Sequence, residues 1–145
     1  MIYKIEKLEK DIKNGDYNYI PKASGVYRVL NLDNMPIKFL NKAKNTNFNE
    51  YEVDFLSQKY SKSVQSKVLY IGKGENLHKR IKQYIKYGLN LAKNHKGGRA
   101  IFQIENYNEL YIEIILTDRC ECAEKGMLVG FNQQYGELPV ANMKS

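Results

Sequence analysis

The stretch VLYIGKGENLHKRIKQYIKYG, residues 68–88, decides the fold, because it joins a strand to a helix through a short glycine turn. Its first four residues, 68–71, are β-branched, aliphatic or aromatic, which favours a strand. Gly72 and Gly74 follow and allow a close backbone approach and a turn. Asn76 is a residue type that commonly begins a helix, since its side chain can accept a hydrogen bond from the first helical turn. The stretch therefore predicts a strand, a turn and a helix in immediate succession.

The helix expected after Asn76 has two different sides. Its apolar residues recur at helical spacing and predict the buried side, formed by Leu77, Ile81, Tyr84 and Ile85. The lysines are expected on the exposed side, at Lys79, Lys82 and Lys86. Arg80 and Tyr84 lie four positions apart and so share one side, which could be a working surface. Gly88 is a natural end for this helix.

The composition is that of a basic protein with one domain. Its 145 residues are enough for a single hydrophobic core, so we expect one domain over residues 1–145. Lysine and arginine number 23 against 16 aspartates and glutamates, which gives a net charge of +7. This charge favours a polyanionic partner, and nucleic acid first. Charge alone leaves another interpretation open, because many basic proteins are merely well solvated.

The sequence predicts neither membrane attachment nor disulfides. Residues 1–5 run directly into charged residues and no apolar stretch is long enough to span a bilayer, so we expect a cytoplasmic protein without membrane contact. Cys120 and Cys122 are too few to define a disulfide framework or a complete zinc site. A mixed metal site that recruits His78 and His95 is an alternative, and buried or unused thiols are the favoured interpretation.

Hydrophobic periodicity predicts the remaining elements. Residues 26–30 alternate as a strand, with Tyr27 and Val29 on one face. The other expected elements are a helix over 3–14, a short strand over 37–40, a helix over 50–60, a helical turn over 100–105, a strand over 110–116 and a helix over 120–135. Gly136 is expected to end the last helix.

Several residues of different chemistry occur in a recognisable order along the chain. The order is Gly25-Val26-Tyr27, then Tyr70-Ile71-Gly72, then Arg80, then Glu124 in a later helix, and Asn142 after a proline. This pattern resembles the GIY-YIG nuclease family, with GVY in place of GIY. Lys73 directly after YIG, and Tyr84 four residues after Arg80, resemble the version of the site in the bacterial nucleotide-excision endonuclease subunit. The resemblance extends over residues 25–142.

The resemblance implies an α/β fold of the α+β type, in which a small, mainly antiparallel sheet of about three strands is flanked by helices. The expected strands are those at Val26, Val68 and Tyr111, and the expected helices are those at Leu77 and Glu124. Tyr27 and Tyr70 are 43 positions apart, whereas the family usually joins these strands by a much shorter turn, so we expect residues 31–66 to be an insertion. The insertion, the loop around His95 or a protein partner would then supply specificity.

The resemblance also implies roles in phosphodiester hydrolysis. Glu124 would hold one divalent metal ion at the scissile phosphate, which suits Mg²⁺, and Mn²⁺ could substitute. Arg80 would bind the same phosphate with its planar set of donors. Asn142 would brace the helix that carries Glu124.

The tyrosines would activate and orient the attacking water. Tyr27 is the expected general base, and its ordinary pKa of about 10 would be lowered by the charges of Lys73, Arg80 and the metal. Tyr70 would orient the water or Tyr27. Tyr84 would form a hydrogen bond within the same cluster.

The predicted function is a metal-dependent endonuclease that hydrolyses DNA, and two alternatives stay open. One is a noncatalytic nucleic-acid-binding module whose phosphate contacts come from Lys79, Lys82, His95, Lys96 and Arg99. The other is a subunit of a repair or defence assembly that docks a protein partner through residues 31–66. His78 and His95 match no position of the family motif.

Overall fold

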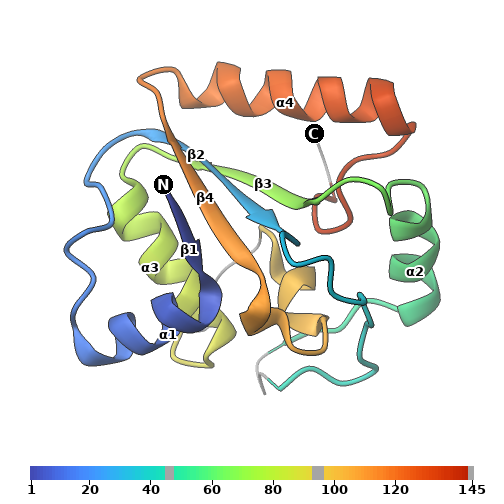
Figure 1. Ribbon diagram of the computed structural model, residues 1–145, viewed down its shortest axis with the longest axis horizontal. Coiled ribbons are helices and arrows are strands. Elements are labelled where there is room, and N and C mark those ends of the chain that lie inside the picture. Colours follow the sequence, from blue (N-terminus) through green and yellow to red (C-terminus); the bar gives the residue numbers. More distant parts are fainter. Residues whose placement is uncertain (45–47, 93–96, 144–145) are drawn as a thin grey trace.

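The computed structural model describes residues 1–44, 48–92 and 97–143, and a four-stranded antiparallel sheet forms its centre (Figure 1). The strands lie in the order β1 (Ile2–Lys4), β4 (Tyr111–Leu116), β2 (Gly25–Leu30) and β3 (Val68–Gly74). Strand β3 is therefore one edge of the sheet and β2 is its neighbour.

Helices cover both faces of this sheet (Figure 1). α1 (Ile5–Asn14) and α3 (Leu77–Gly88) pack against each other on one face, and α4 (Cys120–Tyr135) crosses the other. This arrangement is the α+β class that the sequence predicted. None of the helices in the described ranges is long and apolar enough to cross a membrane.

The connections between strands contain the shorter elements. The segment between β2 and β3, residues 31–66, carries α2 (Val53–Ser61). Two short 3-10 helices, η1 (Arg99–Gln103) and η2 (Tyr107–Glu109), lead into β4. The first of them lies within the helical turn predicted from the sequence, apart from its opening residue.

The alternation of side chains along β2 separates two cores. Tyr27 and Val29 face the larger core, to which α1, α3 and η1 contribute. Val26 faces the opposite side, where it packs with Ile71 of β3 and Leu128 of α4. A strand that is buried on both faces presents one set of side chains to each layer of helices, as the period-two pattern predicts. β2 thus contacts the helices on both faces of the sheet.

The sheet has one strand more than the sequence predicted. β1 pairs with β4, with Tyr3 opposite Ile112. The sequence assigned this segment to the start of the first helix, because three residues carry too little alternation to distinguish a strand from a helix end. Helical structure begins only at Ile5, whose N–H donates to the carbonyl of Leu110.

The strand predicted over residues 37–40 is wrong. Within the described residues, Phe39 makes an isolated bridge with Ile104 and the segment joins no sheet. Its backbone pairs instead with the end of η1, through Leu40 N–H to the Gln103 carbonyl and Glu105 N–H to the Lys38 carbonyl. Residues 37–40 thus form their backbone hydrogen bonds with the end of a 3-10 helix. Because a 3-10 helix is not extended, the pairing stops at a single bridge and no strand forms.

The ends of the long helices follow the sequence signals. The side chain of Asn76 accepts a hydrogen bond from the Lys79 N–H, 3.2 Å away, and α3 ends at Gly88. Gly136 follows α4 with φ +73°, a conformation that most other residues adopt only at a cost. These caps place Arg80 in the first turn of α3, and the start of α4 places Glu124 in its second turn.

The described parts of segment 31–66, residues 31–44 and 48–66, are folded into the domain. Phe39, Phe48 and Leu56 are buried in the larger core. Asn31 closes the turn at the start of the segment by exchanging two hydrogen bonds with the backbone of Met35. Residues of this segment are therefore available to form walls of any cavity next to the core.

Candidate active site

Three tyrosines from three elements form the centre of the candidate site. Tyr27 of β2, Tyr70 of β3 and Tyr84 of α3 lie with ring centroids 5.8 to 5.9 Å apart. The register places Tyr27 opposite Gly72 and Val29 opposite Tyr70, so both strand tyrosines project from the same face of the sheet. Although 43 positions separate them in the sequence, antiparallel pairing makes them diagonal neighbours.

Steric crowding by Tyr27 explains why position 72, in the sequence Tyr70-Ile71-Gly72, is a glycine. A side chain at Gly72 would place its Cβ 2.6 Å from Cζ of Tyr27. Such a distance is shorter than real Cβ contacts, and the Tyr27 ring is fully buried and cannot move aside. Gly72 therefore makes the space that the Tyr27 ring occupies.

Two further glycines, Gly97 and Gly98, also pack closely against the tyrosines. A Cβ on Gly97 would lie 2.6 Å from the Tyr70 hydroxyl oxygen, and one on Gly98 would lie 2.7 Å from the Tyr70 ring. Gly98 also has φ +73°, and the Tyr84 hydroxyl donates to its carbonyl at 2.7 Å. This hydrogen bond gives Tyr84 a definite task, which is to hold the glycine segment against the cluster.

Burial dominates the chemistry of Tyr27. Its side chain has no exposed surface, and its hydroxyl has no hydrogen-bond partner within the described residues. Burial raises the pKa of Tyr27, and the positive charge of Arg80 opposes this rise without overcoming it. The lowered pKa expected from the sequence is therefore wrong for the free protein, in which Tyr27 is a neutral phenol at neutral pH.

Lys73 does not face Tyr27. It is three residues after Tyr70 on the same strand, so alternation directs it to the opposite face. Its ammonium nitrogen lies 3.2 Å from a carboxylate oxygen of Glu121 and 4.0 Å from one of Glu124, both on α4. Lys73 therefore acts on the carboxylates and not on the tyrosine.

Glu124 reaches from α4 toward the edge strand β3. Its side chain is 22 % exposed, and burial raises its pKa, opposed by the charges of Lys73 and then Arg80. The positive charge of Arg80 acts on the pKa of both Tyr27 and Glu124, so its guanidinium is within electrostatic reach of both. Gly74 packs closely against the base of the Arg80 side chain, because a Cβ on Gly74 would lie 2.9 Å from the Cβ of Arg80. This packing positions the start of the Arg80 side chain.

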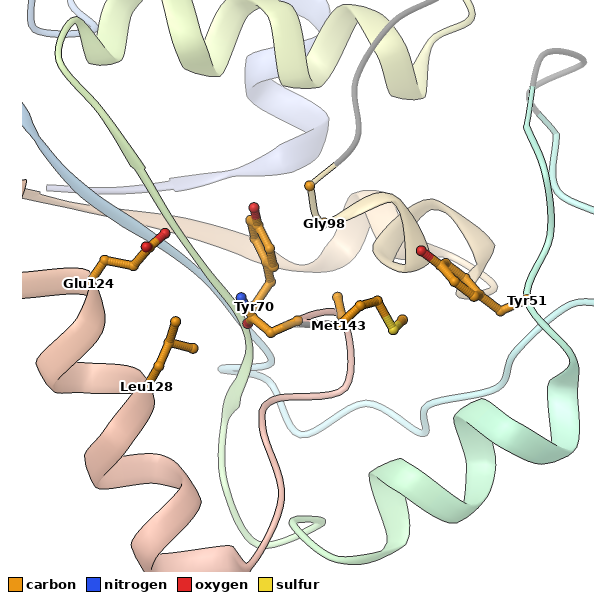
Figure 2. Close-up of a pocket in the computed structure, with 9 residues that line it drawn as sticks. Tyr51, Tyr70, Gly98, Glu124, Leu128 and Met143 are labelled. Atoms are coloured by element: carbon orange, nitrogen blue, oxygen red, sulfur yellow. The ribbon is translucent and has the colours of Figure 1, made fainter. Parts of the chain in front are cut away.

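A cavity of about 400 Å³ opens beside these groups (Figure 2). Figure 2 shows Glu124 and Leu128 of α4 at one end, Tyr51 at the other, and Tyr70, Met143 and Gly98 between them. A second hollow of about 620 Å³ shares Glu124 and Leu128 with the first and is bordered by Lys73 and Lys125. Glu124 thus stands where the two hollows meet.

Asn142 lines the cavity but does not brace α4, as the sequence had suggested. Its side-chain oxygen accepts from the Ile71 N–H and its side-chain nitrogen donates to the Ile71 carbonyl, both at 2.9 Å. The side chain is 6 % exposed. Asn142 therefore completes the free edge of β3, next to Tyr70.

The residues present fit a lightly held divalent ion. Within the described residues, no group of three or more His, Cys, Asp or Glu side chains could hold a metal by itself. Mg²⁺ often binds through one or two carboxylates together with waters and substrate phosphates, so it needs no such group. The Glu124 carboxylate borders open cavities, and the ion pair recorded for it among the described residues is with Lys73 at 4.0 Å. This leaves carboxylate oxygen lone pairs for an ion.

Of the basic residues predicted to bind nucleic acid, Lys79, Lys82 and Arg99 lie in the described part of the chain, and none of the three lines the cavity. Lys82 lies 6.0 Å from the ring centroid of Tyr17, and Lys79 is exposed in the first turn of α3. Arg99 stacks over the ring of Tyr51 at 4.6 Å. His95 and Lys96 lie outside the described residues.

His78 and the cysteines have structural surroundings. The His78 ring stacks on Tyr17 with centroids 5.0 Å apart, and its Nδ1 lies 2.9 Å from the Ile20 carbonyl. Cys120 is buried and Cys122 is exposed, both as free thiols. His78 ties α3 to the loop after α1 and shares the face of Lys82, whereas Arg80 and Tyr84 share another.

Sequence reasoning missed the wall formed by Tyr51 and its support. The backbone N–H and carbonyl of Tyr51 both bond to the side-chain amide of Gln103, at 2.9 and 2.7 Å. Gln103 has no exposed surface. A glutamine within an apolar run is a weak hint of such a buried polar clamp, but its partner 52 positions away cannot be read from spacing.

Comparison of the chain with protein-family models, with curated proteins and with solved structures finds no match. The functional argument therefore depends on the residues of the site and their geometry.

Proposed function

We propose that this protein is a metal-dependent endonuclease that hydrolyses DNA phosphodiester bonds at the cavity beside Glu124. The observation that carries the proposal is the meeting of three distant segments at one place. Tyr27 packs against Tyr70 with ring centroids 5.9 Å apart, Tyr70 and Glu124 line one cavity, and the charge of Arg80 acts on Tyr27 and Glu124. These residues are up to 97 positions apart in the sequence. Buried titratable groups gathered beside a cavity are typical of catalytic sites.

Glu124 would hold the divalent ion of this reaction. When bound, Mg²⁺ or Mn²⁺ would supply charge stabilisation for the phosphate and its leaving oxygen. The raised pKa of Glu124 reflects the cost of burying its charge, and a cation beside it would relieve that cost. Lys73 keeps the carboxylate partly compensated in the free protein.

Arg80 binds the scissile phosphate in this proposal. Its guanidinium presents a planar fork of donors, which suits the charge that spreads over phosphate oxygens during the reaction. Its positive charge also stabilises a negative charge on Tyr27, and it is the largest of the effects that oppose the rise in the Tyr27 pKa caused by burial. Arg80 therefore serves both the substrate and the base.

In this proposal Tyr27 accepts the proton of the attacking water, and Tyr70 orients that water or the Tyr27 hydroxyl. Among the described residues the Tyr27 hydroxyl makes no hydrogen bond of ordinary geometry, although Tyr70 and Arg80 are near enough to affect its pKa, so it can form such a hydrogen bond. Because its pKa is raised, the phenolate is scarce at neutral pH and each further unit of pH makes it more abundant.

The first prediction concerns Glu124. Glu124→Gln and Glu124→Ala should reduce nicking of plasmid DNA in Mg²⁺ below about one hundredth of the wild-type rate, because the metal-binding charge is lost. Glu121→Gln is the matched control, since Glu121 is a neighbouring carboxylate of α4 with an 83 % exposed side chain that also pairs with Lys73. It should retain most of the activity.

Circular dichroism and thermal unfolding establish that the variants are folded. Unchanged cutting by a folded Glu124→Ala protein would remove Glu124 as the metal ligand. Binding that weakens steeply with salt, with no cleavage in either metal, would instead favour the noncatalytic binding module. The net charge of +7 is compatible with both outcomes.

A further inference from the structure

Tyr51 closes the end of the cavity opposite Glu124 (Figure 2). It belongs to segment 31–66, which lies between the two motif strands and is not part of the motif itself. Met143 and Tyr70 lie between Tyr51 and the carboxylate. The cavity therefore has a charged end, at Glu124, and an end lined by an aromatic ring and a thioether.

The wall formed by Tyr51 is firmly supported. The Gln103 amide holds both backbone polar groups of Tyr51 and also donates to the Leu40 carbonyl at 2.8 Å. The guanidinium of Arg99 covers one side of the Tyr51 ring at 4.6 Å. An aromatic ring fixed before binding loses little conformational freedom when a ligand packs against it.

The segment that carries Met143 is fixed by the same insertion. Lys59 of α2 is buried, and its ammonium group donates to the Asn142 carbonyl and lies 3.7 Å from the Met143 sulfur. α2 and Tyr51 thus shape two walls of one cavity. Segment 31–66 forms the part of the site that the motif residues do not provide.

The size and lining of the cavity suit one nucleoside. Its volume of about 400 Å³ falls in the range of small-molecule sites, roughly 300–1,000 Å³, and is far too small for stacked base pairs. Aromatic side chains bind unpaired bases of any sequence, because every base has a π-face. A base in a duplex would first have to leave its stack, which costs least where the nucleotide is already unpaired.

We propose that this cavity holds an unpaired nucleobase of DNA, packed against Tyr51 and Met143, next to the phosphate at Glu124. This rests on the proposed nuclease function and adds its substrate class, which is DNA with unpaired nucleotides in preference to perfect duplex. Tyr51 is then a specificity-determining residue supplied by the insertion.

The test measures binding without cleavage. Fluorescence anisotropy in EDTA compares three labelled oligonucleotides of equal length, namely a single strand, a duplex with one bulged nucleotide and a perfect duplex. The wild type should bind the first two about tenfold more tightly than the third. Tyr51→Ala should lose about tenfold in affinity for the single strand and the bulge only, whereas Tyr51→Phe should retain it because the ring is kept.

A base analogue and a matched control sharpen the test. A 2-aminopurine at the bulge should lose fluorescence on binding to the wild type, through stacking, and not on binding to Tyr51→Ala. Tyr135→Ala removes a partly buried tyrosine from the end of α4, outside the lining of this cavity, and should change neither result. Because Gln103 holds Tyr51 by its backbone, Tyr51→Ala should stay folded.

Equal affinity for all three oligonucleotides, or a preference that persists in Tyr51→Ala, would overturn the inference. These outcomes are distinct from failure of the nuclease proposal, which is decided by cleavage in Mg²⁺ with the Glu124 and Glu121 variants. A protein that cuts perfect duplex as fast as bulged DNA keeps the proposed function and loses the base site.

Discussion

The ring of Tyr27 occupies the space that a side chain at position 72 would need. The bulky Tyr27 and the small Gly72 are therefore explained by the same contact. The ring packs against Tyr70 and Tyr84 and has no exposed surface. Such a position makes a phenol a weak acid, because its charged form loses hydration. The consequence for the reaction is a dependence on pH that can be measured.

The pH dependence of cleavage tests Tyr27 as the base. Burial raises the pKa of Tyr27, so the phenolate fraction should increase about tenfold per pH unit between pH 7 and 9, and kcat should rise with it. Single-turnover rates with saturating Mg²⁺ across this range measure the slope. Tyr27→Phe should lose both the activity and the slope. A Tyr27→Phe protein that cuts with the wild-type slope would assign the proton transfer to another group.

At the scale of elements, the free edge of β3 is the feature on which the site depends. β3 is outermost in the sheet, and residues 141–142 run beside it, with Ala141 N–H donating to the Leu69 carbonyl at 3.0 Å. The amide of Asn142 continues this pairing by bonding to both backbone groups of Ile71. Tyr70, between these two strand residues, is thereby held from its outer edge.

The pairing predicts a large stability effect from a small change. Asn142→Ala leaves the buried N–H and carbonyl of Ile71 without partners, which should lower the free energy of unfolding by about 2–4 kcal/mol. The carboxylate introduced by Asn142→Asp can still accept from the Ile71 N–H, but it cannot donate to the Ile71 carbonyl and places a negative charge beside it. Asn142→Asp should therefore be no more stable than Asn142→Ala. Urea unfolding followed by circular dichroism measures both, and a loss below about 0.5 kcal/mol for Asn142→Ala would contradict the structural role.

Most elements could be predicted because their signals are local. The apolar period and caps of residues 77–88, and the alternation of 26–30, each specify one element without reference to the rest. β1 could not be predicted, because its three residues become a strand only by pairing with β4. The segment 37–40 has strand-like composition, but its backbone partner is a 3-10 turn more than sixty positions away.

The site could be predicted in part for the same reason. Motif order along the chain identified the residues that meet, but not the direction in which each one points. Lys73 could have been assigned correctly, since its distance of three from Tyr70 on one strand implies the opposite face. The contact of Asn142 with β3 and the clamp of Gln103 on Tyr51 join segments far apart in sequence, and no spacing rule reaches them.

At the scale of the whole molecule, the candidate site is also a large share of the core. Tyr27, Tyr70 and Tyr84 join α3 to the two motif strands, and all three are buried. Burial raises the pKa of each. The residues proposed to work at the site therefore also contribute to how the fold responds to alkali, together with other tyrosines of raised pKa such as Tyr19 and Tyr107.

The sign of this response follows from the unfolded chain. Exposed tyrosine ionises at a pKa of about 10, so above that pH the unfolded chain releases protons that the buried tyrosines retain. Stability is therefore complete below about pH 10 and falls as the pH rises above it. Because half of the exposed tyrosine is already ionised at pH 10, each group contributes about 1 kcal/mol over the next pH unit. The three together should therefore lower the free energy of unfolding by about 3 kcal/mol between pH 10 and 11.

Urea unfolding at fixed pH values from 8 to 11 measures this loss, and the ultraviolet absorbance of tyrosinate shows when the rings ionise. We expect the last tyrosines to ionise together with the loss of circular dichroism, because their charged forms are accommodated only by the unfolded chain. Tyr84→Phe removes one titrating group and the hydrogen bond to Gly98, so it should be less stable at pH 8 yet lose about 1 kcal/mol less between pH 10 and 11. If all tyrosines of the wild type ionise while the protein stays folded, water has access to the cluster in solution, and the raised pKa of Tyr27 cannot be what limits cleavage at neutral pH.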